Sequence, residues 1–224
     1  MSTLVLVRHG RSTANTAGVL AGRTPGVLLD DIGRRQVRDT AHRLEQVPLA
    51  RVVSSPLERT RQTAEAILEN RDTPLTTDSA LTECDYGTWQ NRTLRELAEE
   101  DLWKVVTSRP SAAAFPGGES MIDMRARAVD AVARHHAAVE EESGDSAVWA
   151  VVSHGDIIKA VIADAYGMPF DNFQRVHVDP ASVTVIRYTR STPQVLCVNT
   201  TAGDLSWLSG DSSTATRVGG GAGH

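Results

Sequence analysis

Three short apolar runs, each leading into a polar turn and then a helical pattern, constrain the fold of this chain most. Residues 4–7 form the first run, residues 51–54 contain the second, and residues 147–152 give the strongest strand signal in the sequence. Strands that alternate with helices predict an α/β fold around a mostly parallel sheet. In such a sheet each crossover returns the chain to its start, so all the strand-to-helix turns point to the same edge.

Each of these turns carries an arginine or histidine side chain. The first run ends on Arg8 and His9, the second is followed by Arg59, and the third leads into His154. One isolated Arg-His pair is more simply a solvated turn, but three turns of this kind should form one polar cup that suits a dianion. Helix N-termini at the same edge add backbone N–H groups, and Asn15 could supply another donor. The sequence therefore predicts a phosphate site.

Capping residues predict where the first helices begin. Asp30 or Asp31 can cap a helix whose apolar residues recur at helical spacing. The next helix is predicted from the stretch SSPLE, with Ser55 as the N-cap and Glu58 completing a capping box.

The second half of the chain predicts two more helices and a hairpin. Residues 93–106 indicate one helix that begins with a Thr93 and Glu96 capping box. Ser120 begins a long helix, whose inward-facing side chains are predicted to be Ile122, Val129, Val132 and Val139. Residues 182–188 and 194–199 indicate a hairpin, and an edge strand is predicted near Leu75.

The composition is that of a globular chain with no bulk positive charge. Its 224 residues predict a single domain over residues 1–208, followed by a flexible tail rich in Gly, Ser and Thr over residues 209–224. The 23 Lys and Arg against 28 Asp and Glu give a net charge of −5. We therefore expect no nucleic-acid partner and no attraction to an anionic membrane.

The cysteines and the hydropathy pattern give the expected location. Cys84 and Cys197 lack CxxC spacing, so they predict buried or half-buried thiols and neither a disulfide framework nor a metal knuckle. No signal-peptide pattern and no apolar run of membrane length is present in the sequence. A cytoplasmic protein is the expectation.

Five motifs in order resemble those of the histidine phosphatase superfamily. They are RHG after the first strand, then SSPLERTRQTAE, LTECDYG, PGGES and SHGD, and the match runs from Thr3 to about Tyr188. RHG alone is weakly specific, whereas the ordered set is highly specific. The resemblance implies a phosphoglycerate mutase-like fold, which is a three-layer α/β/α sandwich with a central, mostly parallel sheet.

The resemblance also implies a role for each matching residue. His9 would be the nucleophile that becomes phosphohistidine, and Glu83 would give and take the proton. Glu119 of PGGES would be a structural or capping residue near the pocket. The residues implied to bind the substrate are Arg8, Asn15, Gly22, Arg59, His154 and the amide of Gly155.

The chemistry needs these residue types. An imidazole nitrogen attacks phosphorus only when it is unprotonated, and neighbouring cations favour that form. Fixed arginine donors can stabilise the charge on the transferring group without a metal ion or another cofactor. One carboxyl group can protonate the leaving alkoxide and later accept a proton from water.

Three functions stay open from the sequence. The leading one is a metal-independent phosphatase for a small-molecule phosphate ester. The second is a phosphoglycerate mutase that depends on 2,3-bisphosphoglycerate, and the third is a non-catalytic protein that binds a phosphorylated ligand. Arg11 and Asp156 stand where the mutases more often carry other residues, and the stretch between Glu83 and His154 is compact, which favours the phosphatase. The natural substrate is not readable, and a homo-oligomer such as a dimer stays open.

Overall fold

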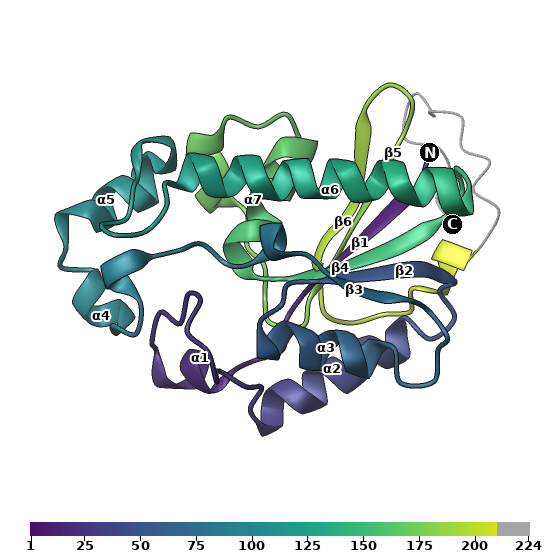
Figure 1. The fold of residues 1–224 in the computed structure, drawn as a ribbon, viewed down its shortest axis with the longest axis horizontal. Coiled ribbons are helices and arrows are strands. Elements are labelled where there is room, and N and C mark those ends of the chain that lie inside the picture. Colours follow the sequence, from purple (N-terminus) through teal and green to yellow (C-terminus); the bar gives the residue numbers. More distant parts are fainter. Residues whose placement is uncertain (210–224) are drawn as a thin grey trace.

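The computed structural model describes residues 1–209, which form a six-stranded sheet covered by helices on both faces (Figure 1). The strand order is β3-β2-β4-β1-β5-β6. The strands are β1 (Thr3–Arg8), β2 (Leu49–Ser54), β3 (Leu75–Thr77), β4 (Val148–Ser153), β5 (Val183–Tyr188) and β6 (Pro193–Thr200). The first four run parallel to one another, and β5 and β6 join antiparallel at one edge. The predicted mostly parallel sheet, the edge strand near Leu75 and the hairpin are thereby confirmed.

The helices form the two outer layers. In Figure 1, α6 (Met121–Ser143) and α7 (Gly155–Ala165) cover one face of the sheet, and α2 (Asp31–Arg43) and α3 (Glu58–Ile67) cover the other. Three shorter helices lie beyond the end of the sheet: α1 (Thr13–Ala17), α4 (Leu94–Leu97) and α5 (Asp101–Ser108). The three-layer α/β/α arrangement expected from the resemblance is confirmed.

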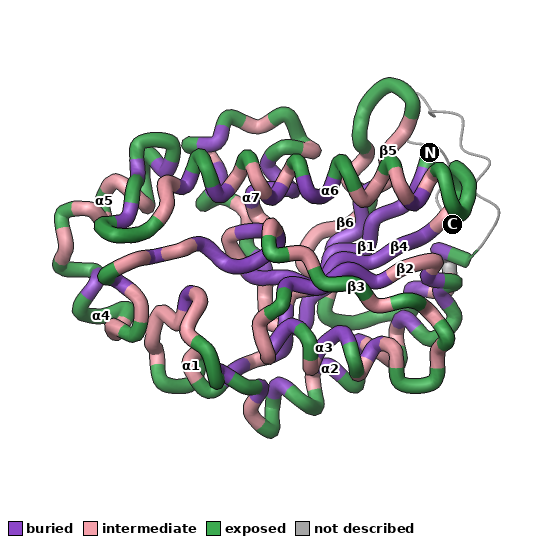
Figure 2. The backbone as a smooth tube through the Cα atoms, in the orientation of Figure 1, coloured by how far each residue is buried: buried purple, intermediate pink, exposed green. Residues whose placement is uncertain are grey.

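Two separate apolar cores hold the layers together, because alternate residues of a strand face opposite sides. Leu4 and Leu6 pack in the core under α6 and α7, whereas Val5 and Val7 pack in the core above α3. β1 and β4 therefore bury almost every residue, and they form the purple centre of Figure 2. Strands buried on both faces read as continuous apolar runs, which is why these two were visible in the sequence.

The prediction for the start of α3 is wrong. The helix begins at Glu58 and its N-cap is Leu57, which makes no side-chain capping hydrogen bond. The Glu58 side chain accepts from the backbone N–H of Gly26 and closes no capping box. Ser55 instead places its hydroxyl 2.8 Å from Nε2 of His154. At the start of α2 the prediction holds, because the Asp30 side chain accepts from the N–H of Gly33.

Two predictions for the second half need correction. Residues 93–106 form two helices, since α4 ends after Leu97 and α5 begins at Asp101, although the Thr93 and Glu96 capping box is present. In α6 the predicted inward residues Val132 and Val139 are buried, whereas Ile122 is exposed and Val129 only half-buried. The buried residues of α6 are Met121, Met124, Ala128, Ala131, Val132 and Val139. The first two predicted residues, Ile122 and Val129, each lie one position after a residue that is buried, Met121 and Ala128.

The remaining predictions concern the ends of the chain and the cysteines. Cys84 is a buried free thiol and Cys197 a half-buried one, as predicted. The tail predicted over residues 209–224 lies, apart from Ser209, outside the described residues. Within residues 1–209, no helix has both the length and the apolar character needed to cross a membrane.

Candidate active site

The turns after β1, β2 and β4 meet at one edge of the sheet, where they line a pocket of about 310 Å³. Their meeting follows from the register, because Arg8 at the end of β1 lies opposite Ser153 at the end of β4. His9 and His154 come next in their chains, and the centroids of their rings lie 5.3 Å apart. Seven of the eight predicted site residues line this pocket: Arg8, His9, Asn15, Gly22, Arg59, Glu83 and Gly155.

His9 is buried, with 4% of its surface exposed, and its two ring nitrogens have different partners. Nδ1 lies 2.7 Å from the carbonyl oxygen of Gly10, which can only accept, so Nδ1 carries the proton. Nε2 therefore has the lone pair, and it accepts from Nε of Arg59 at 3.3 Å. Burial, reinforced by the charges of Arg59 and Arg8, holds the pKa of His9 well below its usual value. Nε2 can thus serve as a nucleophile at neutral pH.

Arg8 and Arg59 supply the positive charge beside that nitrogen. Nη1 of Arg8 donates to the carbonyl of Val178 at 2.6 Å, and Nη2 of Arg59 donates to the carbonyl of Gly22 at 2.7 Å. Each arginine also has a buried nitrogen, Nε of Arg8 and Nη1 of Arg59, with no hydrogen-bond partner among the described residues. Buried donors of this kind are costly unless a ligand satisfies them. A phosphoryl group has the oxygens to do so.

Two glycines let the backbone come close to its neighbours around His9. A Cβ on Gly10 would lie 2.6 Å from a methyl group of Val37 and 2.7 Å from the carbonyl oxygen of Gly33. Gly22 has a φ of +52°, and a Cβ there would lie 2.5 Å from the Gln90 side chain. Gly22 lines the pocket, and its carbonyl orients Arg59.

His154 is the predicted site residue that does not line the pocket. It is fully buried behind His9, and the two rings meet edge to face. Its Nε2 lies 2.8 Å from the Ser55 hydroxyl, while Nδ1 has no partner among the described residues. Burial, and then the charge of Arg59, holds the pKa of His154 well below its usual value. Sequence reasoning missed Ser55 as a partner of His154 because its place before a helix indicated a cap.

Glu83 brings a carboxyl group to the same pocket. Its Oε1 accepts from the backbone N–H of Cys84 at 2.9 Å. Burial, together with the negative charge of Asp156, raises the pKa of Glu83 to about 7. Asp156 in turn accepts from the hydroxyl of Tyr86 at 2.7 Å. A carboxyl group with this pKa can both give and accept a proton near neutral pH.

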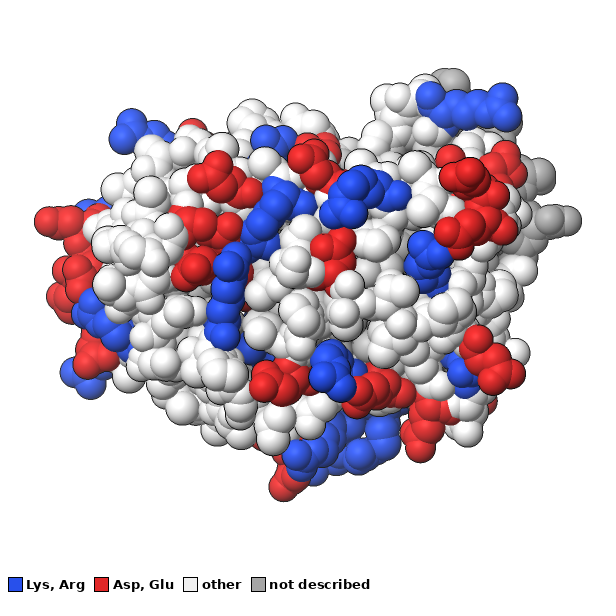
Figure 3. All heavy atoms as spheres, in the orientation of Figure 1, with Lys and Arg blue, Asp and Glu red and all other residues white. Residues whose placement is uncertain are grey.

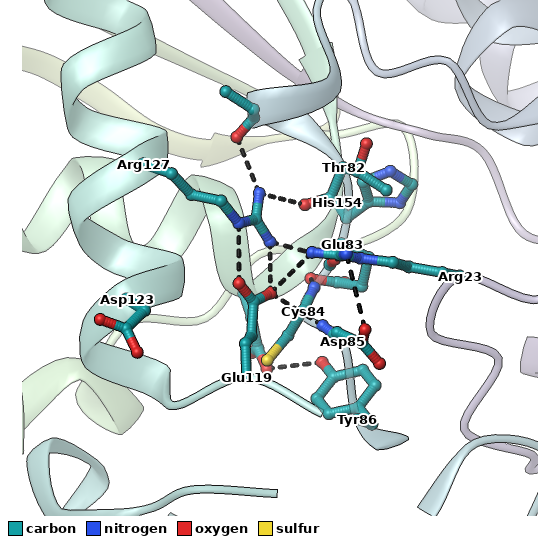
Figure 4. A network of polar contacts seen from close by, with 12 residues as sticks. Arg23, Thr82, Glu83, Cys84, Asp85, Tyr86, Glu119, Asp123, Arg127 and His154 are labelled. Atoms are coloured by element: carbon teal, nitrogen blue, oxygen red, sulfur yellow. Dashed lines mark hydrogen bonds and ion pairs between the residues drawn. The ribbon is translucent and has the colours of Figure 1, made fainter. Parts of the chain in front are cut away.

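A network of charged side chains holds the backbone of Glu83 from behind (Figure 4). Arg127 of α6 forms two hydrogen bonds with Glu119 and donates to the carbonyls of Ala80, Thr82 and Glu83. Arg23 reaches the same place from the first loop, where it donates to the Glu83 carbonyl at 2.9 Å and to Glu119 at 2.9 Å. Burial alone would raise the pKa of Glu119, but the hydrogen bonds from Arg127 and the Asp85 N–H outweigh it and lower that pKa.

This network fits the structural role expected for Glu119, which does not line the pocket. Sequence reasoning missed Arg127 and Arg23. The available signal for Arg127 was its position on α6 eight residues after Glu119, near Met124 and Ala128, which face the core. Arg23 could have been noticed only as a charged residue inside a Gly-punctuated loop.

The other candidate residues lie as follows. Asn15 lines the pocket, and its Oδ1 accepts from the N–H and the hydroxyl of Ser12, so that it closes the capping box of α1. The Gly155 backbone begins α7 beside the guanidinium of Arg8. Arg11 forms an ion pair with Asp30 at 2.7 Å and does not line the pocket.

On the face seen in Figure 3, acidic and basic side chains are mostly interspersed, with small groups of one sign at the lower and the right edge. In the part of the chain that the structure describes, no group of three or more His, Cys, Asp and Glu residues is arranged so that it could hold a metal ion.

Comparison with known proteins gives one family. The sequence profile of the histidine phosphatase superfamily (branch 1) matches residues 4–201. The chain is 30% identical over 193 residues to the probable phosphoglycerate mutase GpmB of Yersinia pestis, a match that covers 85% of this chain and 87% of the relative.

Solved structures give the same result. YhfR of Bacillus stearothermophilus superposes with a TM-score of 0.80 and 28% identity, covering 93% of this chain and 100% of the other. A mycobacterial glucosyl-3-phosphoglycerate phosphatase in complex with VO3 has a TM-score of 0.80 and 25% identity, covering 88% and 98%. The alpha-ribazole phosphatase of Shigella flexneri has a TM-score of 0.79 and 26% identity, covering 89% and 97%.

Proposed function

Because this chain belongs to the histidine phosphatase superfamily, we propose that it hydrolyses small phosphate monoesters without a metal ion, through a phosphohistidine on His9. The observation that carries the proposal is the environment of Nε2 of His9. This nitrogen is unprotonated, its lone pair accepts only a long hydrogen bond of 3.3 Å from Nε of Arg59, and one buried nitrogen each of Arg8 and Arg59 lacks a partner among the described residues.

The first half-reaction transfers the phosphoryl group to the protein. Nε2 of His9 attacks phosphorus, an N–P bond forms, and the bond from phosphorus to the ester oxygen breaks. Arg8 and Arg59 stabilise the charge on the phosphoryl oxygens, and the buried His154 supports the ring of His9. Protonated Glu83 donates its proton to the departing alkoxide, which leaves as the alcohol.

The second half-reaction releases phosphate. Water takes the place of the alcohol, Glu83 as carboxylate accepts one of its protons, and the oxygen attacks phosphorus. The N–P bond breaks, inorganic phosphate leaves, and His9 and Glu83 return to their starting protonation states. The sum is ester plus water giving alcohol plus phosphate.

The positive charge that stabilises the transferring phosphoryl group would come from arginine side chains instead of a metal ion. We therefore expect hydrolysis of p-nitrophenyl phosphate to survive EDTA and to be inhibited by vanadate, which mimics five-coordinate phosphorus. Loss of activity in EDTA that returns with Mg²⁺ or Zn²⁺ would overturn the metal-free mechanism.

The intermediate is tested by trapping labelled phosphate on the protein. His9→Ala should abolish both turnover and labelling while the fold survives. His154→Ala should lower the chemical rate and leave some labelling. Trapped phosphate on His154 would reverse the assignment of the two histidines.

A phosphoglycerate mutase is the second candidate, because the 30% identical relative carries that name. A mutase of this family would show strong activation by 2,3-bisphosphoglycerate and would move phosphate between positions of phosphoglycerate. A phosphatase would release inorganic phosphate with or without that compound. A third possibility, a protein that binds a phosphorylated ligand without turnover, predicts no release of p-nitrophenol.

A further inference from the structure

We call the outer half the part of the pocket lining that consists of Asp156, Lys159, His177 and six apolar side chains. The apolar side chains come from the first loop, from α4 and from the segment before β5, and they are Val19, Leu20, Ala21, Leu94, Val176 and Val178. Leu94, at the start of α4, leaves 44% of its surface exposed. The part of the substrate that leaves as the alcohol must lie against this wall, since the phosphoryl group occupies the end with His9.

Lys159 of α7 is the lysine in this outer half, and its ammonium group contacts three other side chains of the protein. Nζ donates to Oε1 of Gln174 at 2.6 Å and lies 3.5 Å from Oδ1 of Asp156. It also lies 4.0 Å from the centre of the Phe173 ring. Only 14% of the side chain is exposed. The hydrogen bond to Gln174, the ion pair with Asp156 and the contact with the Phe173 ring thus direct the ammonium group toward partners within the protein.

Asp156 is held equally firmly one turn earlier in α7. One carboxylate oxygen accepts from Tyr86 and the other faces Lys159. At the rim, His177 is mostly exposed, and its Nε2 lies 3.0 Å from Oδ1 of Asp179. Both basic groups of the outer half thus have an acidic partner within the protein.

The charges of the pocket therefore balance without a second anion from the substrate. Arg8 and Arg59 match the two negative charges of a phosphate monoester. Lys159 and Asp156 cancel each other. A carboxylate or a second phosphate on the alcohol would lose water beside Asp156 and apolar side chains, and it would gain no unpaired cation in return.

We propose that the alcohol carried by the natural substrate is uncharged and partly apolar, and that the Asp156–Lys159 pair is what rejects anionic alcohols. This inference rests on the phosphatase function proposed above and names its substrate class. It also disfavours 2,3-bisphosphoglycerate as a ligand of this pocket, because that compound carries a second phosphate and a carboxylate.

The test uses pairs of primary alkyl phosphates that differ only in the charge at the far end. Each pair has a terminal carboxylate in one member and the isosteric amide in the other, with chains of three to six carbons. The measured quantity is the ratio of kcat/KM for the amide to kcat/KM for the carboxylate. Wild-type protein should favour the amide by about tenfold or more at the chain lengths that reach Lys159.

Two charge-neutralising variants should move this ratio in opposite directions. Asp156→Asn keeps an acceptor for Tyr86 and frees the charge of Lys159, so the ratio should fall to about one or reverse. Lys159→Met keeps the packing on Phe173 and leaves Asp156 unpaired, so the ratio should rise severalfold. The double variant restores a neutral pair and should return close to the wild-type ratio.

Asp164→Asn is the matched control, because it makes the same charge change on the same helix at an exposed ion pair with Arg125. Its ratio should equal that of the wild type. A wild-type ratio of one or below, or a ratio that Asp156→Asn does not change, would overturn the inference while leaving phosphatase activity intact. Failure to hydrolyse any ester, p-nitrophenyl phosphate included, would instead overturn the proposed function and this inference with it.

Discussion

Two groups of arginines, on opposite sides of Glu83, differ in how well their hydrogen bonds are satisfied. Arg8 and Arg59 at the phosphate end each keep a buried nitrogen without a partner among the described residues. Arg127 in the network behind Glu83 makes five hydrogen bonds, two of them to Glu119. The first group leaves hydrogen-bond donors that a ligand could satisfy, whereas Arg127 finds its hydrogen-bond partners within the protein.

The difference separates two kinds of charged residue that look alike in a sequence. Arginines that keep a buried donor without a partner are only partly compensated for the water they lose, so we expect them to cost stability and to serve activity. Arg127 pairs with the half-buried carboxylate of Glu119, and removing it would leave that carboxylate with fewer partners. Glu83 connects the two groups, since its carboxyl group lines the pocket and its carbonyl is held by Arg127 and Arg23.

The largest effect is expected for Arg59. Arg59→Met removes the guanidinium beside Nε2 of His9 and keeps much of the side-chain volume. We expect kcat/KM for p-nitrophenyl phosphate to fall by about 1000-fold, since arginine donors stabilise the transferring group. The free energy of unfolding, measured in urea, should change by less than about 1 kcal/mol, because Arg59 is buried and forms no ion pair within 4 Å among the described residues. A large loss of stability in Arg59→Met would contradict the proposed difference between the two groups of arginines.

Glu83→Gln should divide the two half-reactions. Phosphoenzyme formation should slow by about 100-fold for an alkyl phosphate and far less for p-nitrophenyl phosphate, whose leaving group needs no proton. Attack of water on the phosphohistidine should slow equally for both, because the same intermediate forms. Stopped-flow traces with the aryl ester should then show a burst of p-nitrophenol followed by a slow steady rate. Equal losses without a burst would exclude Glu83 from proton transfer and make Asp156 the next carboxylate to test.

For Arg127→Met we expect the opposite of Arg59→Met, namely a large loss of stability and a small loss of activity. We expect the free energy of unfolding to fall by about 2 kcal/mol, since Glu119 keeps only Arg23 as a cationic partner and both side chains are partly exposed. Activity on alkyl phosphates should drop by about tenfold through the loosened Glu83, with less change for the aryl ester. Arg134→Met is a control on the same helix, where the arginine is largely exposed and pairs with Asp78. The free energy of unfolding of this control should stay within about 0.5 kcal/mol of the wild-type value.

The smallest effect is a pH dependence. Burial and the charge of Asp156 put the pKa of Glu83 near 7, while the nearby Arg59 and Arg8 act in the opposite direction. In the proposed mechanism the first step needs the protonated form, so kcat/KM for alkyl phosphates should fall by about fivefold between pH 7 and 8 and should not fall below pH 7 through this group. The pKa of His9 is lowered, so its nucleophile stays unprotonated there. The ratio of alkyl to aryl kcat/KM reports the effect, and Glu83→Gln should make that ratio independent of pH.

The sequence by itself determined the sheet and the edge at which the site lies. β1 and β4 are buried on both faces and therefore appear as continuous apolar runs. Parallel strands bring their turns to one edge, so the sequence alone predicts that Arg8, His9, Arg59 and His154 meet. The ordered motifs then indicated the family and the carboxyl group of Glu83. These features are readable because strand burial and chain topology depend on local patterns.

Only the tertiary structure decided which polar groups became partners across the fold. Ser55 looks like a helix cap in the sequence, but its hydroxyl pairs with His154, 99 residues away. Arg23, Glu119 and Arg127 come from three separate segments and meet behind Glu83. Lys159 has its charge cancelled by Asp156, and its remaining contacts come from the segment that contains Phe173 and Gln174. A buried charge must be paired somewhere, but the sequence does not say with which residue, because that choice depends on packing between distant elements.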